Sequence, residues 1–194
     1  FRTLCQILGG QDTHALRAAF DAKLLPRLLA IAAEQDVLPS LAIRCHEQLS
    51  PEQCSNSAAY KTMRNALQAN TLANMAISAQ ALELAKTLNN IGISPLFLKG
   101  TVQLLDANQQ SLGQRKQIDV DFLVEPKHLA SAADALLASG YGFRDPASRY
   151  SPQQRLYYDT PAALKHSESH HHLPALVKEG YATTVELHRH FLPK

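Results

Sequence analysis

Apolar residues recur at helical spacing through most of the first 90 residues. The spacing predicts helices over residues 14–20, 24–31, 39–49 and 58–90, and Pro51 is placed to open a further short helix. Many alanines widen the apolar face of the longest helix, which indicates burial against several neighbours. The first part of the chain is therefore predicted to be a helical region covering residues 1–90.

Beyond residue 90 the pattern changes to strands that alternate with helices. Short period-2 runs predict strands, and longer runs with period 3.6 predict helices. The predicted elements are, in order, a strand at 96–98, a helix at 101–107, a strand at 118–124, a helix at 126–137, a strand at 141–143, and β-like segments at 162–165, 170–177 and 183–191. The chain is thus predicted to be an α+β protein, in which an α/β unit with a small mixed sheet fills residues 91–194. No Pro- or Gly-rich linker precedes this unit, so the two parts are expected to pack together.

Composition narrows the classes of protein to which the chain can belong. Its 194 residues are 45% hydrophobic and 19% charged, which supports a folded core and argues against disorder. The net charge of +2 and the scattered basic residues argue against a general nucleic-acid binder. No apolar run reaches the roughly 18 residues expected of a membrane span. Cys5, Cys45 and Cys54 form no close-spaced metal pair, which favours a reduced, cytoplasmic setting.

The predicted strand at 118–124 carries two aspartates on one face. Alternation places Ile118, Val120 and Phe122 on one side, and Asp119 and Asp121 on the other. Like charges at this spacing repel, so the strand needs a compensating positive charge. The Cα atoms of Asp119 and Asp121 would lie about 6.5–7 Å apart. Carboxylates at that spacing can lean together to bridge divalent cations, as in two-metal phosphoryl-transfer sites.

An anion site is predicted directly upstream of this strand. Residues 96–98 form an apolar run that stops at Lys99-Gly100, and Thr101 follows at the start of a predicted helix. Free backbone N–H groups at a helix N-terminus, beside a lysine, favour phosphate. Lys99, Gly100 and Thr101 are therefore candidate phosphate contacts. A phosphate site followed by a carboxylate pair is typical of proteins that bind a nucleoside triphosphate with Mg²⁺.

Three motifs together carry a resemblance to a known family. They are LFLKG at 96–100, Arg115-x-x-x-Asp119-x-Asp121-Phe-Leu-Val, and VELH at 185–188. The chain resembles, over about residues 90–190, a poorly characterised bacterial nucleotidyltransferase family of the polymerase-β superfamily. Lys99-Gly100 stands where that superfamily usually has Gly-Gly or Gly-Ser. Members usually continue further, so the resemblance also implies a chain that could be truncated at its C-terminus.

The resemblance implies specific roles for the candidate residues. Glu186 would be the third carboxylate, which binds the catalytic metal with Asp119 and Asp121 and draws the proton from an attacking hydroxyl. Arg115 could steady triphosphate charge or form an ion pair with either aspartate. His188 shares a strand face with Glu186, so it could reach the metal or a substrate phosphate.

The activity implied by the resemblance is nucleotidyl transfer. A Mg²⁺-dependent (or Mn²⁺-dependent) enzyme would move a nucleoside monophosphate from an NTP, ATP foremost, to a hydroxyl acceptor and release pyrophosphate. The acceptor could be a small molecule, a protein side chain or an RNA end. The alternative is a catalytically weak nucleotide-binding or partner-binding module with the same fold. The helical region offers surfaces for such a partner protein.

A cluster of histidines raises a third possibility, a transition-metal site. His166, His170, His171 and His172 lie close together in sequence. Consecutive residues of a strand alternate faces, and no cysteine lies nearby to complete a tetrahedral set. We therefore expect most of these histidines to be structural or solvent-facing, and no structural zinc to be held by the cluster.

Overall fold

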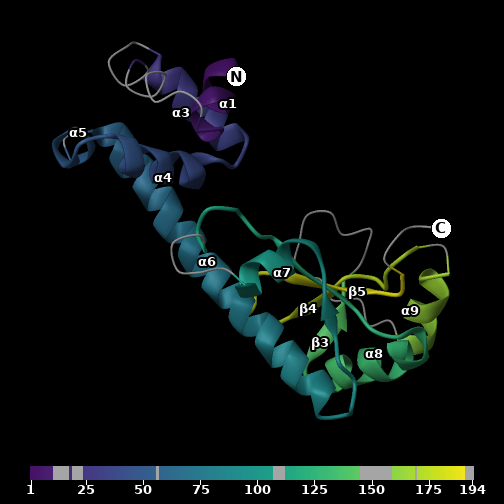
Figure 1. The fold of residues 1–194 in the computed structure, drawn as a ribbon. Coiled ribbons are helices and arrows are strands. Elements are labelled where there is room, and N and C mark those ends of the chain that lie inside the picture. Colours follow the sequence, from purple (N-terminus) through teal and green to yellow (C-terminus); the bar gives the residue numbers. More distant parts are fainter. Residues whose placement is uncertain are drawn as a thin grey trace. The chain divides into compact units, whose positions relative to one another are not determined.

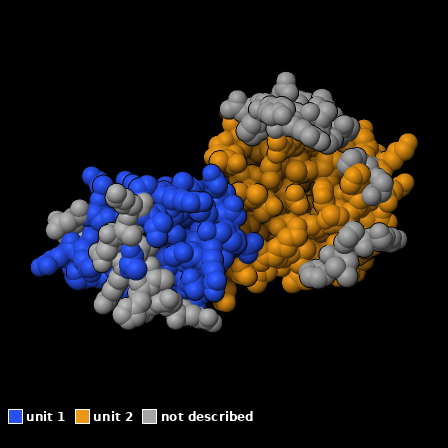
Figure 2. All heavy atoms as spheres, turned by 90° about the horizontal axis from the view of Figure 1, so that it is seen from above, with its two compact units in different colours: residues 1–74, 107–116 blue, residues 75–106, 117–194 orange. Residues whose placement is uncertain are grey.

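The computed structural model describes residues 1–10, 18, 24–55, 57–106, 112–144, 159–168 and 170–190. The chain divides into two compact units, which are coloured separately in Figure 2. Unit 1 comprises residues 1–74 and 107–116, and unit 2 comprises residues 75–106 and 117–194. Among the described helices, none is long and apolar enough to cross a membrane.

Unit 1 is helical, as the apolar spacing predicts. Its helices are α1 (Arg2–Leu8), α3 (Leu25–Glu34), α4 (Leu38–Gln48), α5 (Pro51–Ser55) and the first half of α6 (Ala58–Asn89) (Figure 1). Prolines lie in the first turns of α3, α4 and α5, where no intrahelical N–H bond is lost. Leu4, Ile7, Leu28, Leu41 and Met63 are among the buried residues of its core. Helix α1 was not predicted, and most of the helix predicted at 14–20 lies outside the described residues.

Residues 112–116 lie against helix α6 within unit 1. Asn74 donates through Nδ2 to the carbonyls of Leu112, at 2.6 Å, and Arg115, at 2.8 Å. Asn70 donates to the carbonyl of Gly113 at 2.6 Å. A Cβ on Gly113 would come within 2.1 Å of Oγ1 of Thr71, so only glycine fits this approach to the helix. The polar segment is therefore fixed by side chains of α6.

Unit 2 contains a mixed five-stranded sheet in the order β1-β2-β5-β4-β3. The strands are β1 (Leu96–Phe97), β2 (Asp119–Leu123), β3 (Tyr141–Phe143), β4 (Leu176–Lys178) and β5 (Thr184–His188). Only the β2–β5 pair is parallel among the described pairs. The helices of this unit are the second half of α6, α7 (Lys99–Asp106), the short η1 (Pro126–His128), α8 (Leu129–Ala138) and α9 (Thr160–His166). The predicted α+β class with a mixed sheet is confirmed.

The central strands follow the predicted alternation on their apolar side. Val120 and Phe122 of β2, and Val185 and Leu187 of β5, are fully buried. Ile118 was expected to share this face, but it precedes the strand and is 67% exposed. Helix α7 follows β1 directly and packs on β2, and α8 packs on β3 (Figure 1). The alternate positions of β2 and β5 carry the polar residues Asp119, Asp121, Glu186 and His188.

Of the β-like predictions near the C-terminal end, the one at 162–165 was wrong and the one at 170–177 holds only in part. Residues 162–165 belong to helix α9, because Asp159 caps it by accepting a hydrogen bond from the N–H of Ala162, at 2.9 Å, and Pro161 suits its first turn. Within 170–177 only β4 and an isolated bridge between His172 and His188 are extended.

Candidate active site

The parallel pairing of β2 and β5 brings the predicted acidic residues together. Asp121 and Glu186 are direct Cα partners in the register, and Asp119 pairs with Thr184. Directly paired residues of neighbouring strands point to the same face of a sheet. Glu186 therefore lies on the strand next to Asp121, on the same face of the sheet.

Asp121 lies at the centre of a network of charged hydrogen bonds. Its Oδ1 atom is 2.7 Å from Nζ of Lys99 and 2.8 Å from Nε2 of His188. Its backbone N–H donates to Oγ1 of Thr101 at 3.0 Å. The Asp121 side chain is 1% exposed, and that of Lys99 is 53% exposed. Asp121 is therefore a buried carboxylate that two basic side chains and a buried threonine hold in place.

Glu186 and His188 complete a group with the geometry of a metal site. Oε2 of Glu186 lies 3.6 Å from Nε2 of His188 and 4.0 Å from Nζ of Lys99. One ligand atom each from Asp121, Glu186 and His188 can be chosen so that all lie within 4.8 Å of one another. Among the described His, Cys, Asp and Glu residues, this is the one group of three with that property. Two carboxylates and an imidazole are all ligands that divalent metals accept, so the residues present fit such an ion.

Asp119 lies on the same strand face but has a different partner. Its Oδ1 atom accepts a hydrogen bond from Nε2 of Gln117 at 2.9 Å, and the same amide donates to the Asp119 carbonyl at 2.8 Å. Burial raises the pKa of the Asp119 carboxyl, and the charges of Asp121 and Glu186 raise it further. The proposed metal ligation by Asp119 stays a prediction, because this residue is outside the three-residue group.

His188 and the carboxylates of Asp121 and Glu186 stabilise one another in their charged forms. Burial alone would raise the pKa of Asp121, but hydrogen bonds from His188 and Lys99 hold it below its usual value. The neighbouring His188, whose Nε2 lies 3.6 Å from Oε2 of Glu186, lowers the pKa of Glu186. Burial alone would lower the pKa of His188, yet its hydrogen bond to Asp121 and the nearby Glu186 carboxylate raise it. The carboxylates are therefore favoured in their charged forms without any other cation.

The start of helix α7 has an unusual local geometry. Lys99 has a positive φ of 50°, a conformation that costs a non-glycine residue about 1–2 kcal/mol. Nζ of Lys99 contacts Asp121 at 2.7 Å, although about half of the side chain is exposed. A Cβ on Gly100 would come within 2.1 Å of Oε1 of Gln117, so the Gln117 amide rests on the backbone at the helix N-terminus. Thr101 is fully buried, and the phosphate contacts predicted for these three residues stay predictions.

Sequence reasoning missed two features of the site. Gln117 precedes the strand as an ordinary polar residue, and no spacing rule identifies its contact with Asp119 and Gly100. The imidazole ring centroids of His171 and His172 lie 5.3 Å and 5.5 Å from that of His188. The antiparallel bridge between His172 and His188 brings them there, and a sequence shows such a bridge only once the sheet order is known.

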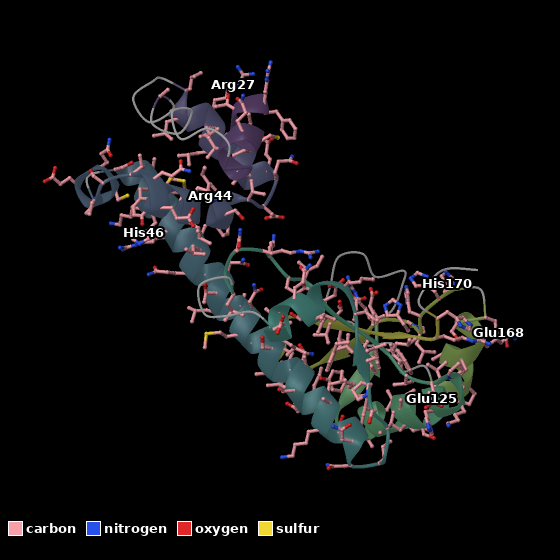
Figure 3. The ribbon with its side chains drawn as sticks, in the orientation of Figure 1. Arg27, Arg44, His46, Glu125, Glu168 and His170 are labelled. Carbon is pink, nitrogen blue, oxygen red and sulfur yellow. The ribbon has the colours of Figure 1, made fainter. Side chains whose placement is uncertain are left out.

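The remaining predicted residues have the following positions. Arg115 belongs to the segment of unit 1 that α6 holds, and its carbonyl accepts from Asn74. His170, labelled in Figure 3, is exposed and lies on the segment that follows α9. The side chain of His166 lies outside the described part of the chain. The role of Arg115 toward a triphosphate stays a prediction.

Comparison with known proteins gives one match. A family model described as "uncharacterised nucleotidyltransferase" matches residues 22–194, which is most of the chain. No curated protein and no solved structure matches.

Proposed function

The chain belongs to this family of uncharacterised nucleotidyltransferases, and from that membership we propose that it transfers a nucleoside monophosphate from an NTP to a hydroxyl acceptor, with release of pyrophosphate. The reaction would require a divalent metal ion. The observation that carries the proposal is the register of β2 and β5, which sets Asp121 directly opposite Glu186 and beside Lys99.

Asp121 and Glu186 differ in exposure, and this assigns them different tasks. Asp121 is almost fully buried, whereas the side chain of Glu186 is 24% exposed. Asp121 would act as a fixed metal ligand, with Asp119 as a further ligand on the same face. Glu186, which the neighbouring His188 keeps ionised, is open enough to accept the proton of an acceptor hydroxyl. The acceptor oxygen then bonds to the α-phosphorus, and the bond to the leaving pyrophosphate breaks.

The phosphate end of the substrate would meet the start of helix α7. The half-exposed Lys99 ammonium can contact phosphate oxygens without leaving the neighbourhood of Asp121. Gly100 has no side chain of its own at the helix N-terminus, and a phosphate there would meet the Gln117 amide that lies against it. Thr101 supports the Asp121 backbone from its buried position. A bound divalent ion would supply Lewis-acid stabilisation of the phosphoryl oxygens.

One observation favours a second candidate, a binding module without efficient turnover. Lys99 and His188 both contact the same oxygen of Asp121, so the protein itself supplies positive charge to the carboxylates. The convergence of these acids is therefore stable without a metal, and by itself it does not distinguish an enzyme from a module. Turnover is the property that separates them.

The test is a screen of the four NTPs with Mg²⁺ or Mn²⁺, with thermal shift and pyrophosphate release as readouts. We expect metal-dependent pyrophosphate release in the wild type. Glu186→Gln should keep the NTP-induced thermal shift but lose about 10²-fold or more in turnover, as expected for removal of a general base. Glu125→Gln, at an exposed carboxylate labelled in Figure 3, is the control and should retain full turnover. A thermal shift without pyrophosphate release under any condition would support the module instead.

A further inference from the structure

The candidate metal group contains a nitrogen ligand. Oδ1 of Asp121 and Nε2 of His188 are 2.8 Å apart, and Oε2 of Glu186 and Nε2 of His188 are 3.6 Å apart. Adjacent ligands of a six-coordinate ion with metal–ligand bonds of about 2.1 Å are about 3 Å apart. Small adjustments would therefore let all three atoms contact one ion. The nitrogen lies between the two carboxylates, so an ion that binds both meets it.

The fold fixes His188 in this position. Its side chain is 1% exposed, and it is the last residue of β5. The bridge with His172 and the bond from the N–H of Leu173 to the carbonyl of Leu187, at 2.9 Å, hold the end of the strand. The rings of His171 and His172 pack beside that of His188. The imidazole is thus prevented from moving away when an ion binds.

Compensation of charge alone does not require His188. Nζ of Lys99 already lies 2.7 Å from the same Asp121 oxygen and supplies a permanent positive charge. A second basic group at that oxygen is explained by metal ligation, because imidazole is a good ligand and an ammonium is none. The other members of the group, Asp121 and Glu186, provide the two negative charges that a divalent ion needs.

We propose that this site selects a divalent transition-metal ion such as Mn²⁺ over Mg²⁺, because His188 ligates it through Nε2 beside Asp121 and Glu186. Mg²⁺ demands oxygen ligands in near-ideal octahedral geometry and gives up water reluctantly. Later divalent ions of the first transition row accept imidazole readily. The inference rests on the proposed function, since it names the metal class of that same site.

The direct test uses the wild-type chain labelled with ¹⁵N only in histidine. Mn²⁺ is added without nucleotide, and pulsed electron paramagnetic resonance measures nuclear coupling to the bound ion. We expect a ¹⁵N coupling in the labelled protein and a ¹⁴N coupling in its place in unlabelled protein. Bound Mn²⁺ with no nitrogen coupling, or no bound Mn²⁺ at millimolar concentration, would overturn the inference.

A pair of variants assigns the nitrogen to its residue. His188→Gln keeps a polar side chain but offers only an amide oxygen as ligand, and His190→Gln changes a histidine two residues away that is outside the group. The ratio of Mn²⁺ to Mg²⁺ affinity, from free-Mn²⁺ resonance with Mg²⁺ competition, should fall about 10-fold or more in His188→Gln alone, with loss of the nitrogen coupling. A coupling that persists in a folded His188→Gln variant would overturn the assignment. His188→Asn is the substitute if circular dichroism shows that the glutamine variant fails to fold.

Failure of the proposed metal selectivity can be told apart from failure of the proposed nucleotidyl transfer. All these readouts are taken without NTP, whereas pyrophosphate release tests transfer. Equal binding of Mn²⁺ and Mg²⁺ together with pyrophosphate release would reject the metal selectivity and leave the nucleotidyltransferase standing. Selective Mn²⁺ binding with nitrogen coupling but no release would keep the inference and reject the enzyme.

Discussion

Asp119 and Asp121 lie on one strand face but have opposite electrostatic surroundings. Asp121 is held by Lys99 and His188, which lower the pKa of its carboxyl despite its burial. Asp119 is bonded to the neutral Gln117 amide, and burial with two nearby carboxylates raises the pKa of its carboxyl. The alternation in the sequence could not show this difference, because it treats the two positions as equivalent.

Metal-free stability should therefore respond differently to the two isosteric substitutions. Asp119→Asn removes a disfavoured charge and keeps an oxygen for Gln117, so the free energy of unfolding should stay unchanged or rise by up to about 1 kcal/mol. Asp121→Asn loses a buried charged partner of His188 and should cost about 1–3 kcal/mol; the half-exposed Lys99 adds little of this. Urea denaturation at neutral pH with a chelator measures both. Equal losses of stability would show that the two carboxylates have the same surroundings.

Among the elements, those with a long, regular pattern were predictable. The spacing identified α3, α4, α6, β2 and β5, because burial of one face fixes a period over many residues. It failed at 162–165, where a short apolar run fits both periods and the Asp159 cap decides for a helix. Asp121, Glu186 and His188 were predictable as residues of one face, since strand alternation places them there. The ion pair between Asp121 and Lys99 was not, because it depends on how the start of α7 packs against β2.

Within unit 2, a polar contact connects helix α6 to strand β4. Nζ of Lys178 lies 2.5 Å from one carboxylate oxygen of Glu83, and the Tyr181 hydroxyl donates to the other. The same ammonium lies 5.3 Å from the ring centroid of Tyr141. The hydrogen bond from Lys178, followed by that from Tyr181, lowers the pKa of Glu83 below its ordinary value of 4.5.

The lowered pKa gives this contact a defined pH dependence. A carboxyl group whose pKa falls on folding contributes stability above its unfolded pKa, and this stability is lost as pH falls through the folded pKa. Glu83→Gln should therefore cost up to about 1 kcal/mol at neutral pH, a value limited by solvent screening of the 39% exposed side chain. The difference from wild type should shrink as pH falls through the lowered pKa. Melting temperatures across that range measure it. Glu125→Gln should show a much smaller trend, because solvent screens the exposed pair with Lys127 although the pKa of Glu125 is also lowered. A deficit that persists in acid would assign the effect to packing.

At the scale of the whole molecule, the chain passes between the two units three times, after residues 74, 106 and 116. Helix α6 contributes its first half to unit 1 and its second half to unit 2. The segment at 112–116 lies only a few residues before Asp119 in sequence, yet its hydrogen bonds go to Asn70 and Asn74 of unit 1. Packing therefore predicts that this segment opens with unit 1, whereas connectivity predicts that it opens with strand β2.

Hydrogen exchange after a core substitution in each unit distinguishes packing from connectivity. Leu41 of α4 and Leu136 of α8 are both fully buried, and replacement of either by alanine should cost about 2–5 kcal/mol. If each unit opens by itself, Leu41→Ala should speed amide exchange in α1, α3, α4 and residues 112–116 and leave β2 and β5 protected. Leu136→Ala should do the reverse, with residues 112–116 still protected although Asp119 follows closely. Faster exchange of 112–116 in step with β2 would mean that the chain connection dominates. Equal acceleration everywhere in both variants would mean that the shared helix α6 makes the molecule one cooperative unit.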